Sequence, residues 1–176
     1  MISVSQFKRL FNDLFLEAEN TLLVDGAAIG ELEPVYRPAT DTSPAQIIFA
    51  HGFLTSALHE TAHWCYAGPQ RRQLEDYGYW YAGDDRDAQQ QRDFEQVEVI
   101  PQAYELLLSE ACGVSFQVSL DNFNPAVELD RDAFTLKVKA MAEEKVKKGL
   151  SLRLLVLLNA CKKVRKKLDM VGVDGN

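Results

Sequence analysis

The sequence is poor in cysteine, the residue that forms disulfide bonds and zinc knuckles. Its 176 residues contain three cysteines, Cys65, Cys112 and Cys161, which lie far apart and form no Cys-x-x-Cys pair. Neither a disulfide framework nor a zinc knuckle is therefore predicted. A long uncharged apolar run is also lacking, and the first apolar stretch is interrupted by Lys8 and Arg9, which argues against a signal peptide or a membrane span. We expect a cytoplasmic protein with reduced cysteines and no membrane partner.

Length and composition favour one domain over residues 1–176, with 47% hydrophobic and 26% charged residues. The charge is unevenly distributed. Residues 1–130 contain 7 Lys and Arg against 21 Asp and Glu, whereas residues 131–176 contain 12 against 5. This basic segment, part of the same domain, could dock an acidic surface or could simply be a pair of solvated helix faces. Its "KKVRKK" run has no interleaved aromatic residues, so no stable nucleic-acid complex is expected.

Hydrophobic periodicity predicts an α+β fold, with a small mixed sheet flanked by helices. Thr55 or Ser56 is predicted to cap the second helix, and Pro101, which lacks an amide proton, to kink or restart the third. The expected helices cover about residues 4–19, 55–66, 88–113, 131–148 and 151–168. The expected strands lie near Val35, at 46–50 and at 114–121, where "VSFQVSLD" alternates with period two.

The motif richest in chemistry is His-Glu-x-x-His, formed by His59, Glu60 and His63 on the second predicted helix. Residues four apart lie one above the other on a helix, so the two imidazoles can bind one metal ion from the same side. Glu60 then projects near that ion. In a hydrolase, either an endoribonuclease or a peptidase, Glu60 would be the general base that activates a metal-bound water.

A third ligand must come from elsewhere in the chain. The extended peptidase pattern would need a histidine where Pro69 stands, so the choices are His51, the one remaining histidine, or a carboxylate such as Glu95 or Glu98, which share a helix face. Two histidines and one carboxylate leave coordination positions open, which suits Fe(II) and dioxygen as well as zinc. If Cys65 or His51 instead completed a four-ligand site, the metal would be structural and the protein a binding module.

The strings "FAHGF", "ALHETAHWCYAG", "RRQLEDYGYWYAGDDRDAQQQ" and "FEQVEVIPQAYELL" together resemble the elongation factor P hydroxylase family, over about residues 46 to 125. The resemblance implies hydroxylation of the β-lysylated lysine of elongation factor P at a two-histidine, one-carboxylate metal centre. Fe(II), with dioxygen as co-substrate, is the expected metal, although another divalent ion such as zinc could be present on purification. His59 and His63 match the histidines of the family motif, and Glu98 matches the carboxylate better than Glu95 does.

A lysine-tipped substrate arm suits the acidic first 130 residues. The predicted substrate-binding residues are His51, an acidic rim at Asp84 and Asp85, and Tyr79 for the apolar stem of the arm. The simpler interpretations are that Asp84 and Asp85 belong to a solvated turn and that Tyr79 belongs to an aromatic core. Glu60 is the predicted catalytic residue, which would position an oxygen species, relay a proton or orient a metal ligand.

Overall fold

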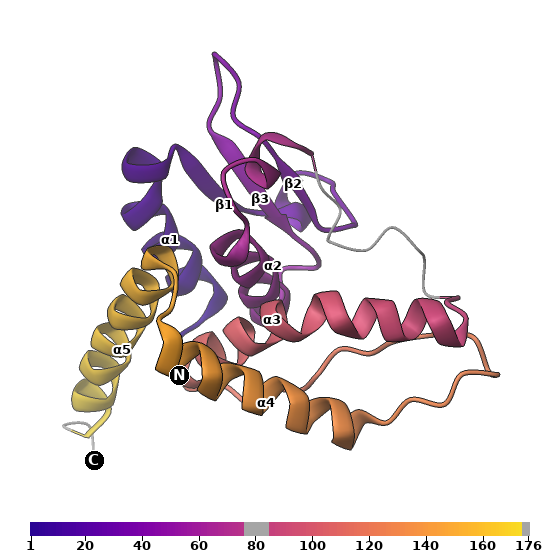
Figure 1. The fold of residues 1–176 in the computed structure, drawn as a ribbon. Coiled ribbons are helices and arrows are strands. Elements are labelled where there is room, and N and C mark those ends of the chain that lie inside the picture. The colour runs from indigo at the N-terminus through magenta and orange to yellow at the C-terminus, as the bar shows by residue number, and fades with distance from the viewer. Residues whose placement is uncertain (76–84, 174–176) are drawn as a thin grey trace.

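The computed structural model describes residues 1–75 and 85–173, which form five helices and a three-stranded sheet. The sheet lies at one end of the molecule against α1 and α2, and the other helices lie beyond them (Figure 1). This arrangement confirms the predicted α+β fold, a single domain with a small mixed sheet flanked by helices. The elements in chain order are α1 (Val4–Glu19), β1 (Thr21–Asp25), β2 (Val35–Arg37), β3 (Ala45–Phe49), α2 (Leu54–Tyr66), α3 (Ala88–Cys112), α4 (Arg131–Lys148) and α5 (Leu152–Val173), with short 3-10 turns at Gly26–Ala28 and Arg71–Gln73.

Strand β3 is the centre of the sheet, whose order is β1-β3-β2. β1 runs parallel to β3 and β2 runs antiparallel to it. β1 was not predicted, although its apolar "LLV" lies between the end of α1 and the turn at Gly26. The side chain of Asn12 holds α1 to β1, because it accepts from the backbone N–H of Leu23 at 2.7 Å and donates to the Leu23 carbonyl at 3.3 Å.

Helix α1 fixes the position of α2 by aromatic packing. Its apolar stripe buries Phe7, Phe11 and Phe15, as the periodicity predicts. The rings of Phe11 and Phe15 meet Trp64 of α2 edge-on, with centroids 5.1 and 5.0 Å apart. Such contacts add to the area that the rings bury. The apolar side of α2 is therefore held in the core, and this leaves the histidine side of the helix to face α3.

The predicted cap of one helix is wrong, and the helix around Pro101 is continuous. Neither Thr55 nor Ser56 caps α2, which begins at Leu54 after an N-cap residue, Phe53, without a side-chain cap. The hydroxyl of Ser56 instead accepts the backbone N–H of Ala50 at 2.9 Å, so it tightens the turn that follows β3. Of the two outcomes predicted for Pro101, a kink or a restart, the restart does not occur, because helix α3 continues across Pro101. The missing amide proton removes one helical hydrogen bond, and the burial of Pro101 holds the helix together around it.

The predicted strand at residues 114–121 does not form, although the alternating burial that suggested it does occur: Val118 and Leu120 are buried and Ser119 is exposed. No described strand lies beside this segment to complete a ladder. Gln102 of α3 takes the place of a neighbouring strand, since its amide donates to the Ser119 carbonyl at 2.8 Å and accepts the Ser119 N–H at 3.0 Å.

The two basic helices pack by their apolar sides. Helix α5 contributes Leu154, Leu157, Leu158 and Cys161 to the main core, which it shares with α1, α2 and the C-terminal part of α3. Helix α4 places Phe134, Val138 and Ala142 in a second core with α3 and the 114–121 segment. None of the described helices combines the length and the apolar character needed to cross a membrane.

Candidate metal centre

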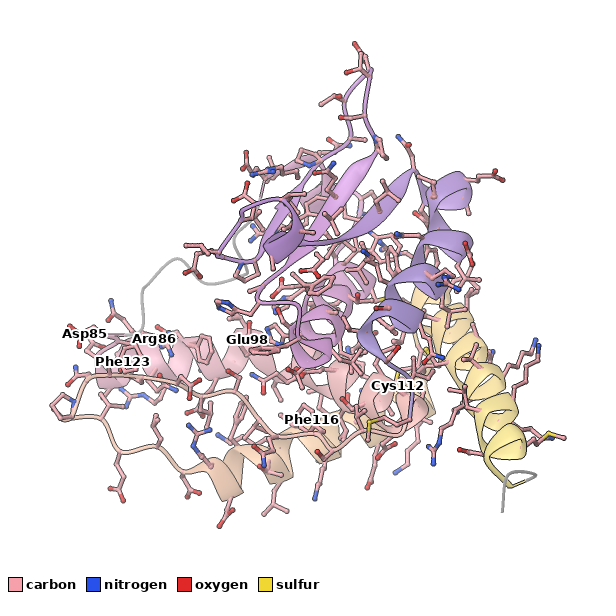
Figure 2. The ribbon with its side chains drawn as sticks, turned by 180° about the vertical axis from the view of Figure 1, so that it is seen from behind. Asp85, Arg86, Glu98, Cys112, Phe116 and Phe123 are labelled. Atoms are coloured by element: carbon pink, nitrogen blue, oxygen red, sulfur yellow. The ribbon has the colours of Figure 1, made fainter. Side chains whose placement is uncertain are left out.

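Three side chains with metal-binding atoms converge where α2 packs against α3. His59 and His63 come from α2, and Glu98 comes from α3, where Figure 2 labels it. Their ligand atoms all lie within 4.8 Å of one another. The two Nε2 atoms are 3.0 Å apart, Oε1 of Glu98 is 3.4 Å from Nε2 of His63, and Oε2 is 3.8 Å from Nε2 of His59.

This spacing fits one ion held by adjacent ligands. Two ligands bound at about 2.1 Å and at right angles to each other are about 3.0 Å apart, which matches the separation of the two Nε2 atoms. The carboxylate lies only slightly farther away. Two imidazoles and one carboxylate on the same side of an ion leave its other positions open to small molecules.

Glu105 orients the first histidine. Its Oε2 lies 2.8 Å from Nδ1 of His59, and because an ionised carboxylate only accepts, Nδ1 carries the proton and donates it. The lone pair of His59 is then on Nε2, which faces His63 and Glu98. In the same way, Gln102 donates from its amide to Oε2 of Glu98 at 3.4 Å. Such outer contacts fix the tautomer and the direction of metal ligands.

Gln102 and Glu105 were not predicted as site residues from the sequence. A signal was present: Glu98, Gln102 and Glu105 recur at i, i+4 and i+7, which places them on one face of a helix. The structure buries all three, with 4%, 0% and 7% exposure. Burying a row of polar side chains on a helix costs free energy unless each one has a partner. The row therefore indicates a functional site.

The electrostatics of the cluster favour a bound cation. Burial opposes ionisation of Glu98, but His63 and His59 outweigh it and hold the pKa of Glu98 at about 2. Burial also disfavours the charged form of His59, yet the carboxylates of Glu105, Glu98 and Glu60 raise its pKa to about 10. The pKa of Glu60 is raised by its burial, against the pull of the two histidines. Three carboxylates beside two imidazoles suit a divalent metal ion.

The other candidate ligands lie elsewhere. Glu95 is directed to Lys137 of α4 at 3.4 Å. The thiol of Cys65 is buried in the main core, and that burial raises its pKa to about 12. His51, exposed in the turn between β3 and α2 with a left-handed φ of 57°, is not among the converging residues. A structural metal site would need a fourth protein ligand. Among the described residues, neither Cys65 nor His51 is placed to provide it.

A groove with a volume of about 1430 Å³ opens beside His59, the one of the three converging residues that lines it. It is lined by the start of α2 and the turn before it, by α3, by the extended 114–121 segment and by α4, and it includes His51, His59, Glu60, Glu105, Glu110 and Lys139. His51 thus lies on the wall of the groove.

The predicted acidic rim is only partly described. Tyr79 and Asp84 lie outside the described residues. Asp85 is exposed and precedes α3, and Figure 2 shows it beyond the N-terminal end of that helix, whereas Glu98 lies near the middle. Glu98 follows the first residue of α3 by ten positions, which is about 15 Å of helix. The structure therefore does not bring Asp85 to the converging side chains.

Fold and site together define an α+β protein with a candidate two-histidine, one-carboxylate metal centre beside an open groove. Residues 10–171 match the model of a family described as elongation factor P hydroxylase. The chain belongs to the elongation factor P hydroxylase family, which confirms the resemblance seen in its motifs.

A curated relative from Haemophilus influenzae carries the name elongation factor P lysine hydroxylase. It is 53% identical to this chain over 116 residues, which are 65% of this chain and 63% of the relative. The chain thus spans less than two thirds of the length of the relative that it matches. The family and this relative do not favour the alternative of a metal-dependent hydrolase.

Proposed function

We propose that this protein is a cytoplasmic, metal-dependent enzyme that hydroxylates the β-lysylated lysine of elongation factor P. Membership of the family and the name of the curated relative support the reaction and the protein substrate. The observation that carries the proposal is the convergence of His59, His63 and Glu98 where α2 packs against α3, with His59 lining an open groove. One domain, residues 1–176, provides the site and the surface that meets the factor.

Fe(II) is the proposed metal and dioxygen the co-substrate. Two imidazoles and a carboxylate are the donor set of many non-haem iron oxygenases. When bound, the iron would supply the chemistry that activates dioxygen for insertion of one oxygen atom into a lysine C–H bond. The second oxygen atom leaves as water, so each turnover consumes two electrons and two protons from a separate reductant. Zinc could occupy the same ligands but would supply no such redox chemistry.

The protein's own side chains have separable tasks in this proposal. His59, His63 and Glu98 hold the ion. Glu105 keeps the proton on Nδ1 of His59, and Gln102 holds Glu98 while it anchors residue Ser119 in the groove wall. The groove admits the modified side chain, whose length lets the main chain of elongation factor P stay outside. The exposed lysines of α4 and α5 are the proposed contact for an acidic surface of that factor.

The proposal is tested by weighing the substrate. Protein purified without oxygen and loaded with Fe(II) is mixed with β-lysylated elongation factor P and a chemical reductant, air is admitted, and the intact factor is measured by mass spectrometry. We expect a mass gain of one oxygen atom, which disappears with His59→Ala and persists with the matched control Glu95→Ala. An unchanged mass with iron confirmed in the wild-type site would reject the proposal.

A further inference from the structure

The role of Glu60 can be inferred from what its neighbours already do. Three carboxylates surround the two histidines. Glu98 meets His63 at 3.4 Å and receives the amide of Gln102, and Glu105 receives Nδ1–H of His59. Glu60 alone of the three makes no hydrogen bond or ion pair within the part of the chain that the structure describes, and it lines the groove next to His59.

The substrate brings a charge that needs such a group. Hydroxylation of a lysine carbon requires that carbon to lie at the metal, so the nitrogen-bearing end of the arm must continue past it along the groove. A β-lysyl group carries two amino groups, both cationic at neutral pH. Moving an ammonium into a partly buried groove is costly unless a carboxylate pairs with it. Glu60 is half-buried and adjacent in sequence to His59, and within the described residues no hydrogen bond or ion pair occupies its carboxylate.

We propose that Glu60 binds an ammonium group of the β-lysyl arm and so determines specificity for the modified lysine. This inference rests on the proposed function. It gives Glu60 a different task from the general base that the same motif position supplies in hydrolases. Insertion of oxygen into a C–H bond does not need a base to activate water, so the charge of this glutamate is available for recognition.

The other charged residues of the groove bear on the assignment. Helix α4 lines the groove with Arg131, Thr135 and Lys139, and the segment before it contributes Asp121. Arg131 and Asp121 pair with each other at 2.9 Å, and Lys139 would repel an ammonium. Glu110, on the same groove wall as Glu105, is exposed and lies near the end of α3, where water screens its charge. Glu105 and Glu60 both line the groove close to the histidines. Glu105 already accepts Nδ1–H of His59, which leaves Glu60 as the carboxylate for the ammonium.

The test separates binding from chemistry. Glu60→Gln, Glu60→Asp and the control Glu110→Gln are loaded with Fe(II), and the metal content is measured. The affinity for β-lysylated factor is then measured without oxygen, followed by kcat and KM in air. We expect full metal content and an affinity weakened on the order of tenfold to a hundredfold in Glu60→Gln, as for loss of one charge-assisted hydrogen bond. Partial recovery in Glu60→Asp and an almost unchanged kcat complete the expected pattern.

A chemical double-mutant cycle sharpens the result. Acetylation of the amino groups of the β-lysyl arm removes the charges that Glu60 would bind. Acetylation should weaken binding to the wild-type protein but have much less effect on binding to Glu60→Gln, because the two changes remove the same interaction. Additive effects would overturn the proposal. So would a large fall in kcat at unchanged affinity, which indicates proton transfer, or loss of the metal, which indicates ligand orientation.

The binding measurement needs no turnover. It therefore decides the role of Glu60 even if the wild-type protein fails to hydroxylate the factor, and failure of the proposed function would appear separately, as an unchanged substrate mass.

Discussion

Replacement of Glu105 by alanine should weaken metal binding without removing any ligand. The change leaves the Nδ1–H of His59 without its acceptor, at a position where the Glu105 side chain is 9% exposed and water has little access. A buried donor left without a partner costs about 1–3 kcal/mol. Since about 1.4 kcal/mol is a factor of ten in an equilibrium constant, we expect a loss of roughly 5-fold to 150-fold in affinity, in line with the effect of outer-shell substitutions at other metal sites.

The assay is competition between the protein and a chromophoric chelator for Fe(II) under nitrogen. Glu105→Gln retains an acceptor oxygen but not the charge, so its affinity should fall between those of the wild type and Glu105→Ala. Glu110→Ala is the matched control, a glutamate on the same groove wall without a hydrogen bond to a histidine. If Glu105→Ala binds metal as tightly as the control does, the orienting role of Glu105 is wrong.

Three further predictions concern the buried contacts of the core and the charged surface of α5. Gln102→Leu removes both hydrogen bonds to the Ser119 backbone. It should lower the free energy of unfolding, measured in urea, by about 2–4 kcal/mol. A loss no larger than that caused by substituting an exposed residue would contradict the anchoring role of Gln102. All three cysteines are at most 1% exposed, so they should resist a thiol reagent in the native protein and react in urea, and rapid native labelling of any one would show that the core opens. Lys162→Glu with Lys166→Glu, both exposed on α5, should raise KM for elongation factor P most strongly at low salt while leaving the melting temperature unchanged. An unchanged KM at low salt would mean that these lysines are only a solvated face.

Elements with a strong periodic signal were predictable from the sequence because their own side chains create the faces that they bury. The apolar spacing of α1 reports directly on its packing against Trp64. The helices α4 and α5 were predicted instead as two segments divided by Gly149, where the structure also separates them. β1 was missed because a three-residue apolar run after a helix has no distinctive period. The 114–121 segment shows the converse case: alternation predicts an extended chain, but only tertiary structure decides whether a strand or a side chain such as Gln102 satisfies its backbone.

The part of the candidate site that depends on spacing within one helix was predictable from the sequence. The spacing of His59 and His63 places them on one helix face wherever that helix lies, so the pair could be recognised without a structure. The choice between Glu98 and Glu95 depends on how α3 meets α2 and α4, and Glu105 depends on the same packing. These are tertiary facts. Local spacing restricted the carboxylates to a short stretch, and the geometry brings together Glu98 with the two histidines.

The central claim is that this protein inserts one atom of dioxygen into the modified lysine at the centre formed by His59, His63 and Glu98. The most direct measurement uses dioxygen labelled with the heavy isotope of oxygen, Fe(II)-loaded protein and β-lysylated elongation factor P, followed by mass analysis of the peptide that contains the lysine. The account predicts one heavy oxygen atom on the lysine side chain with the wild-type protein, and none with His59→Ala. A hydroxyl whose oxygen comes from water, or an unmodified lysine at full iron occupancy, would contradict it.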